Sequence, residues 1–183
     1  MKKRTGFVFL ALLITLGILA VLALGIGSTY IPPGQILEGF FKENRMARVI
    51  VVGLRLPRVL LAIMIGMALS LAGALLQAVM RNPLADPGII GVSAGAAAAA
   101  TSVMLLFPRW LSLVPLVAFV GALFACVLIY LMAWRRGIDP VRIVLSGVAV
   151  NTVLGAYTSF LQLLNSDNLA NVLGFLNGSL SGR

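Results

Sequence analysis

Five long stretches without a charged residue constrain this chain more than any other feature of its sequence. They lie at about 7–27, 59–80, 89–107, 111–134 and 143–164. Each holds about 20 mostly apolar residues, which as an α-helix cross the ~30 Å hydrocarbon core of a bilayer. In lipid, an open segment satisfies its backbone hydrogen bonds only as a helix. The sequence therefore predicts an all-α, polytopic transmembrane helix bundle of about five spans, forming one domain over residues 1–183.

The composition agrees with a protein dissolved in lipid. Hydrophobic residues make up 61% of the chain and charged residues only 10%, against roughly 25% charged residues in soluble domains. The net charge of +9 lies in short clusters between the apolar stretches, where membrane proteins carry their basic residues. We therefore expect contact with membrane lipid and no nucleic-acid partner.

The first apolar stretch follows a basic start, Met1 to Arg4, and so has the outline of a signal peptide. The apolar run from Phe7 to Ile26 is longer than a usual signal core, however, and Ser28–Tyr30 is a poor cleavage site. We expect a retained first span with the N-terminus inside the cell.

Several kinds of chemistry are excluded by what the sequence lacks. No Asp, Glu, Lys or Arg falls within a predicted span, whereas pumps and ion-coupled transporters usually carry such groups there. The chain has no histidine, and its one cysteine, Cys126, lies in an apolar run. It contains no phosphate-binding loop of the Gly-x4-Gly-Lys-Ser/Thr kind. We expect no enzyme activity, no cofactor and no metal site, so energy for any uphill transport must come from a partner.

The connectors and small residues suggest how the spans are arranged. Residues 28–54 form the longest predicted connector, with a short interfacial helix at about 35–41, and residues 82–88 form a turn that contains two prolines. Residues 165–183 are polar and then glycine-rich. Small residues recur every fourth position on two spans, at Ala62, Gly66, Ser70, Ala74 and Ala78, and at Gly147, Asn151, Gly155 and Ser159. Such stripes let helix backbones approach closely in lipid, so they predict a compact bundle without naming a function.

Two motifs at a fixed separation carry a family resemblance. Arg55-Leu56-Pro57-Arg58 precedes the second span, and Arg81-Asn82-Pro83-Leu84-Ala85-Asp86-Pro87-Gly88 follows it. This combination closely resembles the signature of FecCD-type permeases, the transmembrane subunits of ABC importers for ferric siderophores, haem and vitamin B12. The resemblance continues at 145–149 and 176–183. It implies a ten-span family fold of which this chain resembles the N-terminal half.

The resemblance implies a function in iron transport. The chain would be the permease component of a binding-protein-dependent importer for iron–siderophore chelates, with haem or vitamin B12 as alternative cargo. Its partners would be an ATP-binding cassette subunit that hydrolyses ATP, an extracytoplasmic substrate-binding protein and a second permease subunit, identical or different. The place of action would be the bacterial cytoplasmic (plasma) membrane.

The length of the chain leaves another interpretation open. The inner loop with which the family contacts its ATPase would lie beyond this sequence, so we expect that the chain does not couple ATP hydrolysis to transport alone. It would then be a fragment, a disrupted gene product or one half of a split permease. The rival function is a non-transporting fragment or an accessory membrane scaffold.

The resemblance also implies roles for individual residues on the two sides of the membrane. Arg55 and Arg58 would lie outside and bind acidic side chains of the substrate-binding protein, because a guanidinium grips a carboxylate with paired hydrogen bonds. The alternative is that they anchor the helix at the lipid head groups. The inner turn would include Asn82, Pro83, Leu84, Asp86 and Pro87. Within it, Asn82 and Leu84 either narrow the inner end of the pathway or belong to a plain turn, and Asp86 is expected to cap the third helix.

Five further residues within the spans are candidates for the pathway or for helix packing. They are Gln77, Ser93, Asn151, Gly66 and Gly147. Gln77 and Asn151 either line a wet pathway or hydrogen-bond a neighbouring helix, and the sequence does not distinguish these roles.

Overall fold

The structure, a computed structural model, describes residues 2–41, 44–83, 85–88, 90–134, 139–166 and 169–179, with side chains from residue 4 onward. Within these ranges every regular element is a helix and there is no strand, which confirms the predicted all-α fold. Contacts divide the chain within one long helix into two units, residues 1–68 and 69–182. Each unit is described by itself.

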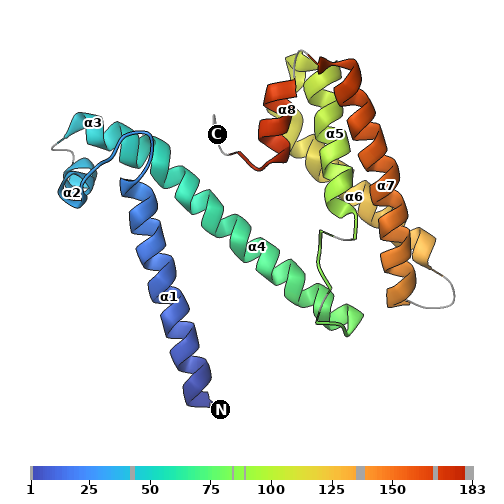
Figure 1. Ribbon diagram of the computed structural model, residues 1–183, viewed down its shortest axis with the longest axis horizontal. Coiled ribbons are helices and arrows are strands. Elements are labelled where there is room, and N and C mark those ends of the chain that lie inside the picture. Colours follow the sequence, from blue (N-terminus) through green and yellow to red (C-terminus); the bar gives the residue numbers. More distant parts are fainter. Residues whose placement is uncertain are drawn as a thin grey trace. The chain divides into compact units, whose positions relative to one another are not determined.

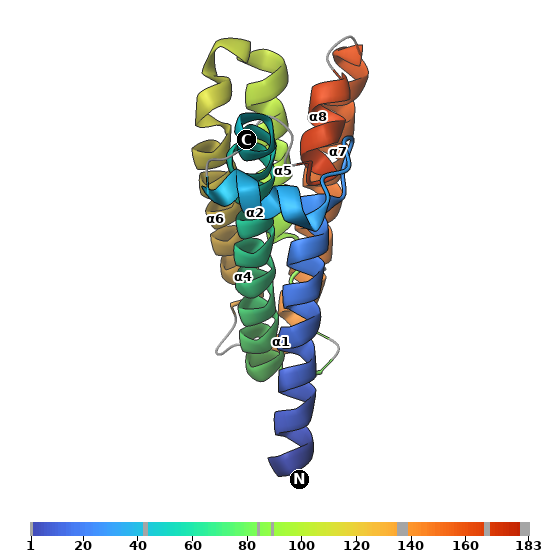
Figure 2. The ribbon, with the colours of Figure 1, turned by 90° about the vertical axis from the view of Figure 1, so that its left-hand side faces the viewer.

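The first unit contains a long apolar helix followed by a compact group of short helices (Figures 1 and 2). Its elements are α1 (Lys2–Gly25), α2 (Pro33–Phe41), α3 (Arg45–Arg48), the π-helical segment η1 (Val49–Arg55) and the first half of α4 (Leu56–Met80). The short helices gather beside the C-terminal end of α1. Their core consists of Ile31, Ile36 and Val51, which are buried, with Leu24 of α1 packed against them.

The predicted short helix at 35–41 is present as part of α2. Its Ile36 is buried in the core of the unit, whereas Leu37 and Phe41 on the same helix are largely exposed. Pro33 suits the first position of the helix because its missing N–H would be unpaired there in any case.

The predicted connector 28–54 is helical from residue 45 onward, which the sequence analysis did not predict, because α3, η1 and α4 form one helical stretch from Arg45 to Met80. Asn44 starts it by accepting a hydrogen bond from the Ala47 N–H at 3.1 Å. The wider π-helical turn lies directly before Pro57. In an α-helix, the ring of Pro57 would clash with the carbonyl of Gly53, and the wider turn relieves that clash.

The second unit is a helix bundle with α5 (Val92–Leu106) at its centre. Around it are α6 (Val114–Ala133), α7 (Pro140–Leu164) and α8 (Leu169–Leu176), and the 3₁₀ segment η2 (Pro108–Leu113) joins α5 to α6. Figure 2 shows α5 between α6 and α7. One buried cluster joins Ala125 and Ile129 of α6 to Val150 of α7. Another joins Leu105 of α5 to Val172 of α8, a helix that the sequence analysis did not predict.

Local signals fix the ends of these helices. Asp139 caps α7 by accepting a hydrogen bond from the Val141 N–H at 3.0 Å, and it also pairs with Arg142 at 3.5 Å. Gly91 precedes α5 with a φ of 87°, and Gly178 follows α8 with a φ of 75°. Both values lie in the left-handed region that glycine adopts readily. Gly91 thereby marks where α5 begins, and Gly178 follows the end of α8.

Four helical stretches among the described residues are long and apolar enough to cross a membrane. They are Arg4–Gly25, Arg45–Met80, Pro108–Ala133 and Pro140–Leu164, and α5 is a shorter apolar helix. The helix α5 begins later than the predicted span because residue 90 lies in a turn and Gly91 is left-handed. The exact limits of the five spans stay a prediction.

Candidate functional site

Four arginines lie between residues 45 and 58 of the first unit, and we call them the arginine cluster. Arg45 and Arg48 are exposed on α3, while Arg55 and Arg58 are half-buried at the junction of η1 and α4. Among the described residues of this unit, Glu38 is the one carboxylate, and no ion pair joins it to an arginine. Among the described residues of this unit, arginines therefore outnumber carboxylates.

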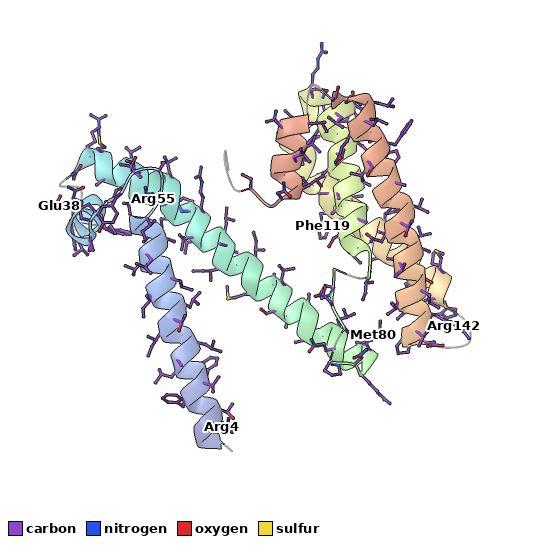
Figure 3. All side chains as sticks on the ribbon, viewed as in Figure 1. Arg4, Glu38, Arg55, Met80, Phe119 and Arg142 are labelled. Carbon is purple, nitrogen blue, oxygen red and sulfur yellow. The ribbon has the colours of Figure 1, made fainter. Side chains whose placement is uncertain are left out.

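The Arg55 guanidinium is bound to the end of α1 (Figure 3). Its Nη1 donates to the carbonyl oxygen of Leu24 at 2.7 Å, and its Nη2 donates to the carbonyl oxygen of Thr29. The last carbonyls of a helix have no partner within the helix, so an arginine is a suitable donor to them. In this structure Arg55 thus closes the end of α1, and its predicted contact with a binding protein stays a prediction.

Gly27 leaves the space that the Arg55 guanidinium occupies. A Cβ atom at residue 27 would lie 2.7 Å from Nη2 and 3.0 Å from Cζ of Arg55. The surrounding bend is also held by a hydrogen bond from the Ile31 N–H to the Gly25 carbonyl at 2.9 Å. We call the carbonyl oxygens of Leu24 and Thr29, together with Gly27, the guanidinium seat. The sequence analysis missed it because its parts lie 26 to 31 residues from Arg55.

Arg58 has a different environment. Its Nε is buried and has no hydrogen-bond partner among the described residues. An unsatisfied buried donor costs free energy, while the Arg58 residue as a whole is half-buried. The predicted role of Arg58 in docking stays a prediction.

The turn after α4 is held by local hydrogen bonds in the second unit. The Asn82 N–H donates to the Gln77 carbonyl at 3.2 Å, and the Ala85 N–H donates to the Asn82 carbonyl at 3.1 Å. Arg81 has a φ of 49°, in the left-handed region, which turns the chain away from α4. Leu84 lies outside the described residues.

The prediction that Asp86 caps the third helix is wrong. Its carboxylate accepts a hydrogen bond from the Gly88 N–H at 2.6 Å. The helix α5 starts only at Val92, with Gly91 at the cap position and no side chain bonded there. Asp86 therefore closes a local turn of the kind that aspartate favours.

A cavity of about 360 Å³ lies between this turn and the start of α7. It is lined by Met80, Asn82, Ala85, Asp86, Ile90, Pro140, Val141, Val144 and Leu145. In Figure 3, the labelled residues Met80 and Arg142 mark the two elements on its sides. The structure thus brings Asn82 and Asp86 of the predicted turn together with Leu145, from the stretch 145–149 where the resemblance continues. Pro83 is exposed and Pro87 half-buried, and Pro87 lines a second cavity of about 440 Å³ together with Ser93.

The remaining predicted residues lie in different surroundings. Gly147 packs directly against the backbone of Ile90, and Asn151 lies next to Gly91. Gln77 is exposed on α4. A Cβ atom on Gly66 would meet no atom within 4 Å. The structure therefore supports helix packing for Gly147.

Comparison with known proteins identifies the family. The model of the FecCD transport family matches residues 12–183. The chain belongs to the FecCD transport family. It is accordingly a multi-pass membrane protein of a transport family, as the apolar helices indicate.

Several curated permease proteins are similar along most of this chain. The Fe(3+)-citrate import system permease protein YfmE of Bacillus subtilis (strain 168) is 37% identical over 183 residues, covering 100% of this chain and 55% of that protein. The achromobactin transport system permease protein CbrC of Dickeya dadantii (strain 3937) is 40% identical, with 87% and 46% coverage. The cobalamin import system permease protein BtuC of Halobacterium salinarum is 43% identical, with 78% and 39% coverage. The chain spans about half the length of the curated relatives it matches.

Proposed function

We propose that this FecCD protein is a permease component of a binding-protein-dependent ABC importer for iron chelates. The match to the family over residues 12–183 carries the proposal, together with relatives named for ferric citrate and achromobactin transport. ATP hydrolysis belongs to a separate ATP-binding cassette subunit, and a second permease subunit completes the pathway in the plasma membrane. Cobalamin is the second candidate cargo, because the cobalamin relative is 43% identical.

The arginine cluster supports delivery by an acidic partner. It carries four positive charges, and the first unit has one described carboxylate. The buried Nε of Arg58 has no hydrogen-bond partner among the described residues. Charged groups of this kind steer a partner of opposite charge and fix its register. In the proposal the cluster therefore lies outside the cell, with the N-terminus inside, and receives the substrate-binding protein.

The turn and its cavity support a role at the inner end of the pathway. Asn82 and Asp86 place polar groups beside an otherwise apolar cavity wall, which includes Leu145. Movement of α7 relative to the turn would change the width of this cavity. Because lipid does not hydrate polar groups, such a lining suits contact with water or cargo.

Uptake of iron tests the proposal. In Bacillus subtilis lacking YfmE, a chimera carries this chain in place of the matching 55% of YfmE. We expect it to restore uptake of radioactive ferric citrate, and Arg58→Glu to lower that uptake about tenfold or more by placing like charges together. Arg109→Glu, at an exposed arginine outside the cluster, serves as the matched control. A chimera that reaches the membrane at the YfmE level without uptake contradicts transport and favours a scaffold.

Labelling tests the orientation separately. Cys126→Ser removes the one natural thiol, and Met46→Cys places a new one between Arg45 and Arg48, where the side chain is 75% exposed. A membrane-impermeant maleimide is expected to label this variant in intact cells. Labelling only after the cells are opened would place the arginine cluster in the cytoplasm and contradict docking outside.

A further inference from the structure

We propose that the guanidinium seat competes with the docking partner for Arg55, so that Arg55 leaves the carbonyls of Leu24 and Thr29 when a carboxylate binds. This inference rests on the proposed function, because it takes the arginine cluster as the docking surface for an acidic protein. It adds a conformational step to docking: one of the two arginines of the motif is held inside the chain until the partner arrives.

The seat is a specific site for a guanidinium. Two nitrogens of Arg55 donate to two carbonyl oxygens that lie on either side of Gly27 in the sequence. The flat group lies against Gly27, where a Cβ atom would come within 2.7 Å of Nη2. An ammonium on a lysine has no planar fork to reach both oxygens in this way.

The seat is also a site that Arg55 can leave. Arg55 is half-buried, and its bond to Thr29 lies in an exposed environment. Both acceptors are neutral carbonyls, whereas a partner carboxylate adds the attraction of opposite charges and can accept two guanidinium nitrogens in a paired geometry. The carbonyls left behind lie at the end of α1 and in a bend, where water can replace the guanidinium.

The competition lowers the affinity of the free chain for acidic ligands. When only a fraction of a protein is in the form that binds, its apparent affinity equals the intrinsic affinity multiplied by that fraction. Filling the seat with a methyl group would push the guanidinium out without removing its charge. Gly27→Ala does this, and the backbone tolerates alanine because residue 27 is not among the glycines with a positive φ.

A binding experiment tests the competition with the full chain in lipid nanodiscs. The probe is a hexaglutamate peptide, and a hexalysine peptide controls for nonspecific binding. If Arg55 is out of the seat in about one fifth of the natural chains, freeing it in all of them raises the affinity about fivefold. We therefore expect Gly27→Ala to bind hexaglutamate about fivefold more tightly than the natural chain. Gly34→Ala, at a glycine with no atom within 4 Å of its Cβ position, is the matched control and should change nothing. Unchanged or weaker binding by a folded Gly27→Ala chain overturns the proposal.

A second pair of variants shows whether the gain acts through Arg55. In an Arg55→Gln background, Gly27→Ala should give no gain, because residues in one network couple in a double-mutant cycle. A gain that persists in this background overturns the proposal. If the Gly27→Ala chain does not fold, the test is instead the rate at which phenylglyoxal modifies Arg55 in the natural chain. Arg55 should react about fivefold more slowly than exposed Arg109 if it is seated most of the time, and equal rates would overturn the proposal.

The outcomes separate this inference from the proposed function. If Arg58→Glu leaves iron uptake unchanged while Gly27→Ala tightens hexaglutamate binding, the seat exists but docking occurs elsewhere. If Arg58→Glu abolishes uptake while Gly27→Ala has no effect, docking stands and the seat does not compete.

Discussion

A Cβ atom on Gly121 would lie 2.5 Å from the carbonyl oxygen of Gly95, so α5 and α6 cross with their backbones in direct contact at these two glycines. No larger residue fits at either position without moving one helix. Because the hydrophobic effect does not drive helices together within lipid, this close packing is a main source of attraction between them.

Gly121→Ala is therefore expected to destabilise the second unit. The added methyl would overpack the crossing, and overpacking typically costs about 1–3 kcal/mol. Thermal unfolding in detergent, followed by circular dichroism, measures the loss. Gly155→Ala on α7 is the control, since its Cβ would meet no atom within 4 Å. Equal melting temperatures for the two variants would contradict the crossing.

Gly91 and Gly147 are expected to act as a coupled pair. A Cβ atom on Gly91 would lie 2.7 Å from the Gly147 carbonyl oxygen, and one on Gly147 would lie 2.9 Å from the carbonyl carbon of Ile90. Alanine at either position disturbs the same contact between the turn and α7. The double variant should lose less stability than the sum of the single variants, with a coupling of about 0.5 kcal/mol or more. Additive losses, measured by the same unfolding assay, would mean that the two glycines act independently.

The hydrogen bond between Ser102 and Tyr157 should contribute a small, measurable stability. The Ser102 hydroxyl donates to the Ala98 carbonyl at 2.7 Å, so the Tyr157 hydroxyl is left as the donor to Ser102 across 2.9 Å. Such bonds between transmembrane helices are worth about 0.6 kcal/mol in double-mutant cycles. A cycle of Ser102→Ala and Tyr157→Phe is expected to give a coupling of this size. A value indistinguishable from zero would show that the contact adds nothing to stability.

Asp86→Asn and Asp86→Ala should have different effects on the inner turn. Asparagine keeps an oxygen that can accept from the Gly88 N–H, whereas alanine removes the acceptor. We expect faster amide hydrogen exchange at Gly88 in Asp86→Ala and nearly natural exchange in Asp86→Asn. If both variants exchange equally fast, negative charge rather than the turn hydrogen bond holds this segment.

The sequence predicted the helical fold well because the apolar stretches are long and free of charge. It also predicted the proline-containing turn, whose residues adopt it through local bonds such as that of Asp86 to Gly88. It missed α8 because that helix has only 8 residues, too few for a span, and is stabilised by burial of Val172 against Leu105. Burial of this kind depends on tertiary packing, which local propensity does not report.

The candidate site was predictable only in part. The motif drew attention to Arg55 and Arg58, but nothing in the order of residues indicates that Arg55 reaches back to Leu24 and Thr29. That contact depends on the bend after α1 and on the absence of a side chain at Gly27. Likewise, the helical stretch before residue 56 depends on the cap at Asn44 and on the wider turn before Pro57.

The π-helical segment Val49–Arg55 sets an angular relationship between the two helices that it joins. Each residue of an α-helix rotates the chain by about 100°, so a surplus residue in one turn changes which side chains share a face by that angle. A family member that lacked one residue here would keep both helices yet direct a different side chain toward the end of the first span. Single-residue insertions and deletions in this stretch would thus change which side chains lie beside the end of α1 while both flanking helices are kept.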